Sequence, residues 1–208
     1  MQKKYLDDYE IGIDEAGRGP LFGRVYAGAV IWGPKTKDYE LIMDSKKLSA
    51  KKRAIALKWI KSNVLAWGIG WAEPNEIDTI NILNATKLAM DRAIDNLKNS
   101  FNIDNELNNL IIDGIGWDKK FKEYNTTSIV KGDTKYLSIA AASILAKEYH
   151  DEYIKQLCNN EPELNEKYDL IKNMGYGTKK HLDAIKKYGN SNYHRITFAP
   201  CCNYVTNL

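Results

Sequence analysis

The chain has 208 residues, a length that suits one ordinary domain or one domain with a helical appendage. Hydrophobic residues make up 44% and charged residues 27%, values near the globular average that exclude a disordered chain. No run of about 18 uncharged apolar residues occurs, so no membrane-spanning segment is expected. Segment 1–10 lacks the apolar region and the cleavage site of a signal peptide. Three cysteines, Cys158, Cys201 and Cys202, form neither a disulfide framework nor a zinc pattern, so we expect a cytoplasmic protein with reduced thiols.

The net charge of +3 is small, but the positive residues are unevenly spread. Residues 167–195 contain seven Lys or Arg and two Asp, which makes this segment +5 and the rest of the chain −2. Residues 46–53 contain five positive side chains and no acid. Two basic clusters on a nearly neutral protein indicate a phosphate-bearing partner. The alternative, a solvated helix face, explains either cluster alone equally well.

Apolar runs and turn signals predict the secondary structure of the first half of the chain. In chain order, we expect strands at 9–14 and 25–32, a helix at 50–62, a strand at 64–71 and a helix at 74–97.

In the second half, we expect strands at 110–113 and 127–130 and helices at 135–158, 164–173 and 180–187. The segment 139–146 is small and apolar nearly all round, which predicts a buried helix that lies close to a sheet. Strands first, then strands mixed with helices, then helices alone indicate an α/β sheet domain with a helical C-terminal part.

Four acids follow predicted strands: Asp14 and Glu15 after the first, Asp113 after a later one, and Asp133 after the next. Functional groups collect beyond the strand ends of an open α/β sheet, where one crevice gathers residues distant in sequence. Four carboxylates placed in this way repel one another unless cations neutralise them. Oxygen ligands without His or Cys suit Mg²⁺ or Mn²⁺. The alternative, that such acids cap helices and form turns, explains one of them well but not all four.

Asp14 and Glu15 are adjacent, and successive side chains of a strand face opposite sides of the sheet. Both can serve one site only where the strand is ending, and the segment Ala16-Gly17-Arg18-Gly19-Pro20 supplies that break. A dinucleotide-binding loop is excluded here, because its third glycine would stand at position 22, which is Phe22, and no helix follows.

Ile13-Asp14-Glu15-Ala16-Gly17-Arg18-Gly19-Pro20-Leu21 resembles the signature of the type 2 ribonucleases H, specifically the bacterial ribonuclease HII family. Later blocks are similar to that family in the same order: 44–49, 82–86, 112–114, 131–133, 139–147, 175–178 and His194-Arg195. The resemblance spans about residues 10 to 200, nearly the whole chain.

The resemblance implies a ribonuclease H-like fold with a mixed central sheet flanked by helices. Residues 1–158 would form the catalytic domain, and residues 159–208 a helical segment packed on it as one functional unit. It also implies a metal-dependent endonuclease that hydrolyses the RNA strand of RNA–DNA hybrids and cuts at ribonucleotides embedded in duplex DNA. The cut would leave 5′-phosphate and 3′-hydroxyl ends. The protein would be a monomer without membrane contact.

The resemblance further implies roles for single residues. Asp14, Glu15, Asp113 and Asp133 match the family's four metal-binding acids, with Mg²⁺ or Mn²⁺ as the cation. Gly17-Arg18-Gly19 matches its ribonucleotide sensor, because a backbone poor in side chains can bind the 2′-hydroxyl that separates RNA from DNA. Tyr176 matches the tyrosine that packs on the sugar there, although one of thirteen tyrosines could simply fill a turn. Candidate phosphate contacts are Lys46, Lys47, Thr178, Lys179 and Lys180.

Two rival functions can be separated from this one. A catalytically silent hybrid-binding protein would not need four acids, and a different two-metal nuclease or phosphotransferase would not need the Gly-Arg-Gly segment. Where the family often has Lys before the Gly-Tyr-Gly turn, this chain has Met174, which removes one possible phosphate contact.

Overall fold

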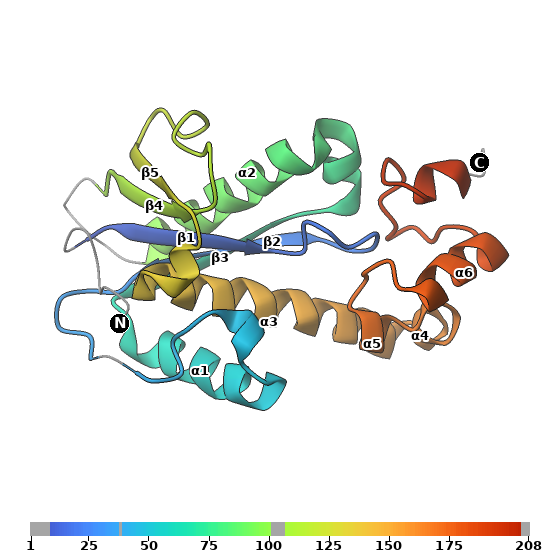
Figure 1. Cartoon of the computed structure of the whole chain (residues 1–208), viewed down its shortest axis with the longest axis horizontal. Coiled ribbons are helices and arrows are strands. Elements are labelled where there is room, and N and C mark those ends of the chain that lie inside the picture. The colour runs from blue at the N-terminus through green and yellow to red at the C-terminus, as the bar shows by residue number, and fades with distance from the viewer. Residues whose placement is uncertain (1–8, 38, 101–106, 205–208) are drawn as a thin grey trace.

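The apolar runs of the sequence form one mixed five-stranded sheet, as expected (Figure 1). The computed structural model describes residues 9–37, 39–100 and 107–204. The strand order is β3-β2-β1-β4-β5, in which β1–β2 and β2–β3 are antiparallel and β1–β4 and β4–β5 are parallel. The strands are β1 Ile11–Ala16, β2 Val25–Ile31, β3 Ala66–Ala72, β4 Asn109–Asp113 and β5 Asn125–Ile129.

Helices cover both faces of the sheet (Figure 1). Helix α2, Pro74–Ser100, packs its apolar face on one side. Helix α3, Leu137–Asn160, lies on the other side together with α1, Ala50–Asn63. Two hydrophobic clusters therefore sandwich the sheet, which is the layered architecture that the order of elements predicts. In the described part of the chain, no helix is long and apolar enough to cross a bilayer.

Helix α3 approaches the sheet as closely as its small residues predict. A Cβ added at Gly12 of β1 would lie 2.5 Å from the Ser138 Cβ, and one added at Gly28 of β2 would lie 2.4 Å from the Ala142 carbonyl oxygen. Glycine in these strands is therefore needed for room, since no side chain fits between the layers. The contact places the first turns of α3 directly against β1 and β2.

Two predicted helices are interrupted in the structure. Asn81 adopts φ +67° inside α2, and its Oδ1 accepts hydrogen bonds from the backbone of Leu83 and Asn84, so it caps the part of the helix that follows. Asp169 adopts φ +58° and divides the expected helix 164–173 into α4, Pro162–Tyr168, and α5, Leu170–Asn173. A left-handed residue cannot continue a right-handed helix, and apolar periodicity does not reveal such a break.

The C-terminal part is helical, as expected. Besides α4 and α5 it contains α6, Lys179–Tyr188, and the short 3₁₀ helix η3, Cys201–Tyr204, all near the far end of α3 (Figure 1). One hydrophobic cluster joins these helices to Leu21 and Phe22, which lie between β1 and β2. The first eight residues, for which no signal peptide is expected, and residues 205–208 of the tail lie outside the described residues.

Replacing Gly28 by alanine should destabilise the fold by about 1–3 kcal/mol, because the new Cβ would overlap the Ala142 carbonyl oxygen. Thermal unfolding should then show a melting temperature lower by about 2–4 °C for each kcal/mol lost. An unchanged melting temperature would mean that α3 can move away from β2 without losing its packing.

Candidate active site

Parallel pairing places two of the predicted acids side by side. The β1–β4 ladder ends at the pair Ile13↔Ile112, so the next residues, Asp14 and Asp113, stand at the same level of the sheet. Asp113 is held in place because its Oδ1 accepts a hydrogen bond of 2.6 Å from the backbone of Gly132. Gly132 begins the short 3₁₀ helix η2, Gly132–Thr134, which also carries Asp133. The four acids thus come from β1, β4 and η2.

The expectation that the first strand ends at Asp14 is wrong, since β1 continues to Ala16. The reason is that β1 pairs with β2 as far as Ala16↔Tyr26, whereas its pairing with β4 stops at Ile13. Beyond Ile13 the strand has one open edge, and both Asp14 and Glu15 line the pocket at that edge. After Ile13, β1 therefore stays paired with β2 but no longer pairs with β4, and the edge that this leaves open is where Asp14 and Glu15 share a site.

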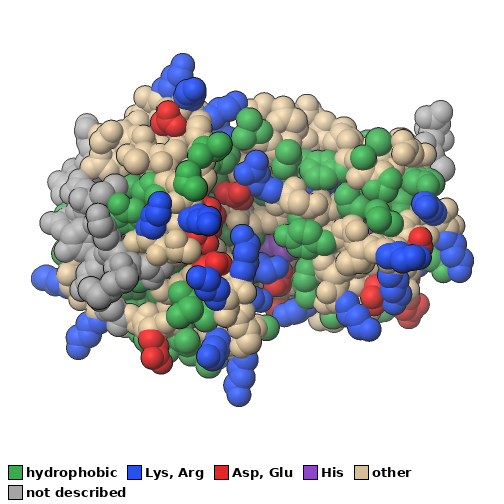
Figure 2. Space-filling model, in the orientation of Figure 1, with side chains coloured by type: hydrophobic (Ala, Val, Ile, Leu, Met, Phe, Trp, Pro, Cys, Tyr) green, Lys and Arg blue, Asp and Glu red, His purple; other side chains and the backbone are tan. Residues whose placement is uncertain are grey.

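The pocket has a volume of about 400 Å³. It brings together three of the acids, the Gly-Arg-Gly segment, Lys46 and Tyr176, and its lining residues are Asp14, Glu15, Ala16, Gly17, Arg18, Gly19, Ser45, Lys46, Asp113, Ser143, Lys147 and Tyr176. Figure 2 shows acidic side chains near the middle of this face, with Lys and Arg side chains around them. A larger hollow of about 600 Å³ lies along the outer edge of β3, and none of the predicted site residues lines it.

Burial raises the pKa of Asp14 well above its ordinary value, and the negative charges of Glu15 and Asp113 raise it further. A hydrogen bond from Ser143 opposes this shift. Burial likewise raises the pKa of Glu15, and Arg18, whose Nη1 lies 3.1 Å from Glu15 Oε1, opposes that rise. Burial and the charges of Asp113 and Asp44 raise the pKa of Asp133, so Asp133 lies near Asp113, although it does not line the pocket. The acids destabilise one another as anions.

These residues suit a divalent cation. Oε2 of Glu15 is buried and has no hydrogen-bond partner in the described residues, whereas Oε1 of the same carboxylate pairs with Arg18, so one oxygen is left for a further ligand. All the acids offer oxygen ligands, which Mg²⁺ and Mn²⁺ prefer. In the described part of the chain, no three His, Cys, Asp or Glu side chains are close enough to hold a metal ion as they lie.

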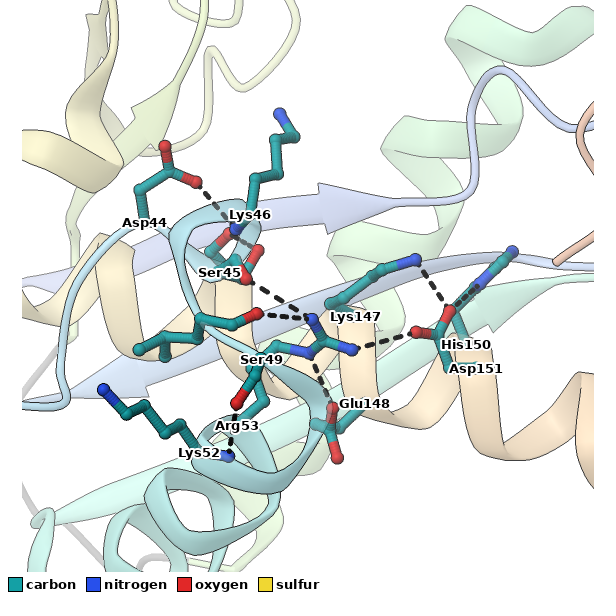
Figure 3. A network of polar contacts seen from close by, with 12 residues as sticks. Asp44, Ser45, Lys46, Ser49, Lys52, Arg53, Lys147, Glu148, His150 and Asp151 are labelled. Atoms are coloured by element: carbon teal, nitrogen blue, oxygen red, sulfur yellow. Dashed lines mark hydrogen bonds and ion pairs between the residues drawn. The ribbon is translucent and has the colours of Figure 1, made fainter. Parts of the chain in front are cut away.

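A polar network fixes the segment that carries Lys46 (Figure 3). The guanidinium of Arg53 donates to the carbonyl oxygens of Ser45 and Leu48 and pairs with Glu148 and Asp151 of α3. These contacts tie the 3₁₀ helix η1, Ser45–Lys47, to α3. The network thus fixes the backbone of the segment whose Lys46 lines the pocket.

The other predicted site residues lie in two places. Tyr176 is 45% exposed, and its Cε1 would lie 3.3 Å from a Cβ added at Gly19, so the ring meets the Gly-Arg-Gly segment. Lys47, Thr178, Lys179 and Lys180 do not line the pocket. Thr178 caps α6 through a hydrogen bond from His181, while Lys179 pairs with Asp183 and Lys180 with Asp169.

Four lining residues were not predicted as site residues: Ala16, Ser45, Ser143 and Lys147. Ser143 hydrogen-bonds to Ser45 across 3.0 Å and also to Asp14. A single small hydroxyl in the apolar run 139–146 was the available signal, because a buried hydroxyl needs a partner.

Asp14→Asn should raise the melting temperature in the presence of a chelator, because it removes a buried charge that Glu15 and Asp113 repel. Each kcal/mol of relief corresponds to about 2–4 °C. The control is Asp183→Asn, which removes an exposed carboxylate paired with Lys179 and should leave the melting temperature nearly unchanged. A lower melting temperature for Asp14→Asn would contradict the electrostatic description of the site.

Comparisons with known proteins identify the family and the fold of the chain. A family model described as Ribonuclease HII matches residues 11–201. A ribonuclease HII from Bacteroides fragilis is 50% identical over 189 residues, which cover 91% of this chain and 88% of that protein. The solved ribonuclease H2 of Pyrococcus horikoshii OT3 has a TM-score of 0.70 at 23% identity and covers 93% of this chain and 95% of its own. Bst-RNase HIII, solved in complex with Mn²⁺, matches with a TM-score of 0.71 at 19% identity. The match covers 94% of this chain and 68% of the Bst-RNase HIII chain. The fold is ribonuclease H-like, and the chain belongs to the ribonuclease HII family, whose members are endonucleases that act on the RNA of RNA–DNA hybrids.

Proposed function

We propose that the enzyme cuts at single ribonucleotides embedded in duplex DNA as well as in RNA–DNA hybrids, and leaves 5′-phosphate and 3′-hydroxyl ends. The observation that carries this proposal is one pocket in which acids of β1 and β4 face the Gly-Arg-Gly segment and Tyr176. Cleavage at one ribonucleotide requires two kinds of group side by side. One kind must recognise a single ribose, and the other must cleave the phosphodiester next to it.

We propose that Asp14, Glu15, Asp113 and Asp133 hold Mg²⁺ or Mn²⁺. Bound divalent cations supply an activated water and stabilise the leaving 3′ oxygen in an in-line displacement. The chain's own residues prepare the site: Ser143 holds Asp14 by a hydrogen bond, and the Gly132 backbone holds Asp113. The buried Oε2 of Glu15, which has no hydrogen-bond partner in the described residues, supports the same assignment.

The 2′-hydroxyl is read, in this proposal, by the backbone of Gly17-Arg18-Gly19 and by Tyr176. The half-exposed ring of Tyr176 lies against Gly19, so a sugar placed there meets both. Lys46 lines the pocket and is suited to the phosphate next to the cut. Lys47, Thr178, Lys179 and Lys180 remain proposed contacts to more distant phosphates, and such phosphates would replace Asp183 and Asp169 as partners of the two lysines of α6.

The division into a catalytic domain, 1–158, and a packed helical segment, 159–208, also belongs to this proposal. The hydrophobic cluster that joins α4 and α6 to Leu21 and Phe22 supports a single functional unit. The cytoplasmic location and the monomeric state stay predictions.

Asp14→Asn and Asp113→Asn should each nearly abolish cleavage of a duplex with one ribonucleotide at saturating Mg²⁺, while the fold persists. Wild-type cleavage should stop in a chelator and return with Mg²⁺ or Mn²⁺. A ligase that needs a 5′-phosphate and a 3′-hydroxyl should reseal the nicked product. Near-wild-type turnover by either variant would refute the metal assignment, and binding without any cleavage by the wild type would favour the silent hybrid-binding protein.

Tyr176→Ala should reduce cleavage of the one-ribonucleotide duplex far more than it weakens binding of the matched all-DNA duplex, because the ring packs on the sugar. Tyr176→Phe keeps the ring and loses one hydrogen bond, which costs about 0.5–1.5 kcal/mol, or roughly two- to thirteen-fold in rate. Single-turnover cleavage and duplex binding are measured for both variants. Equal losses in the two measurements would show that Tyr176 only fills a turn.

A further inference from the structure

Arg195 is fully buried and belongs to the His194-Arg195 block, which the proposed function leaves without a role. All five N–H groups of its guanidinium lie within hydrogen-bonding distance of backbone carbonyl oxygens in loop 17–24, the connection between β1 and β2. The distances are 2.6 Å to Gly17, 3.2 Å to Arg18, 2.8 Å to Pro20, 2.9 Å to Gly23 and 3.0 Å to Arg24. One side chain thus binds most of the loop.

The loop depends on this side chain for its shape. In the described part of the chain, no hydrogen bond joins two backbone groups within loop 17–24. Its backbone bonds run outward instead, from Leu21 to the Gly175 carbonyl, from Gly23 to the Tyr193 carbonyl and from the Arg195 backbone to Leu21. Gly17 and Gly23 have φ +90° and +82°, so the loop also lacks the local stiffness that side chains provide. A lysine has only three donors and cannot reproduce the planar fork.

His194 reaches the other half of the proposed 2′-hydroxyl site. His181 Nδ1 lies 2.9 Å from the Tyr176 carbonyl oxygen, which can only accept, so Nδ1 carries the proton. His194 Nδ1 accepts from the Ser191 backbone, so its proton is on Nε2, which lies 3.1 Å from His181 Nε2. The partners therefore assign one continuous chain, Ser191 to His194 to His181 to Tyr176, and both imidazoles are neutral.

We infer that His194 and Arg195 are positioning residues that hold loop 17–24 and Tyr176 in the relative arrangement needed to read a 2′-hydroxyl. Arg195 fixes the backbone that would bind the hydroxyl, and the adjacent His194, through His181, fixes the turn that carries the ring. The isolated bridge Phe22↔His194 joins loop 17–24 to the segment that carries both residues, and the Leu21 backbone donates to the Gly175 carbonyl oxygen beside Tyr176. This inference rests on the proposed function of Gly17-Arg18-Gly19 and Tyr176.

The test uses Arg195→Lys, His181→Ala and His181→Asn in the full chain. Single-turnover cleavage of the one-ribonucleotide duplex, corrected for the folded fraction, is measured beside binding of the matched all-DNA duplex. Arg195→Lys should reduce cleavage by about tenfold or more and change all-DNA binding less than about twofold. His181→Ala should do the same, and His181→Asn should restore part of the rate, because its amide can still donate to the Tyr176 carbonyl oxygen. The control is Arg92→Lys, since Arg92 binds Glu76 and the Trp71 carbonyl oxygen away from the pocket and should affect neither quantity.

A double-mutant cycle separates positioning from a purely structural role. If Arg195 acts through the 2′-hydroxyl site, its effect should shrink to about threefold or less in the Tyr176→Ala background. A structural role would instead reduce the folded fraction and leave the corrected rate unchanged. Should Arg195→Lys not fold, the two His181 variants decide by themselves.

Wild-type rates for Arg195→Lys and His181→Ala would overturn the inference, as would equal losses of cleavage and all-DNA binding, or full additivity with Tyr176→Ala. In each of these cases the wild type still cuts at one ribonucleotide, so the proposed function survives. Failure of the wild type to cut at an embedded ribonucleotide would overturn both.

Discussion

The close contact of α3 with β1 and β2 is the constraint on which the rest of the structure depends. At Gly12 and Gly28 the helix lies so close to the strands that no side chain would fit between them. This close approach fixes both the distance of α3 from the sheet and its position along the strands. Successive turns of α3 then carry Ser143 to Asp14, Lys147 to the pocket and His150 to the underside of Gly17. The acids and the Gly-Arg-Gly segment are thus held in place by the same helix, because a close-packed interface allows little relative movement of the groups on its two sides.

The negative charges of the site destabilise the folded protein. Buried carboxylates lie beside one another, and their pKa values rise because burial and mutual repulsion both disfavour the anions. Hydrogen bonds from Ser143 and from the Gly132 backbone orient two of the acids, and Arg18 lies against a third. Carboxylates held in this way lower the stability of the fold when no cation is bound, and they are well placed to bind one. Such clusters of acids with raised pKa values are common at functional sites.

The helical C-terminal part is joined to the site by polar contacts as well as by hydrophobic packing. Arg195 and His194 come from the segment after α6, yet they bind the loop between β1 and β2 and the turn before α6. The pocket residues Gly17, Gly19 and Tyr176 therefore lie on two distant segments that a third segment holds together. A catalytic domain without its C-terminal helices would lack half of this arrangement.

The sequence by itself determined the elements, the mixed role of strands and helices, and the place of three acids in one pocket. It could do so because parallel neighbours such as β1 and β4 end at the same edge, so acids at strand ends meet whatever the loops do. The small apolar run 139–146 also predicted that α3 is buried against the sheet, but apolar periodicity missed the helix breaks at Asn81 and Asp169, where single residues have positive φ.

The contacts between side chains far apart in the sequence depend on tertiary packing and could not be predicted from local patterns. Arg195 binds carbonyl groups that precede it by 171 to 178 residues, and Ser45 meets Ser143 across 98 residues, distances over which no local pattern carries information. The same holds for the lysines of α6, whose partners Asp169 and Asp183 follow from how the C-terminal helices fold back on one another. Local propensity and period act within a few residues, whereas these contacts depend on how whole layers pack.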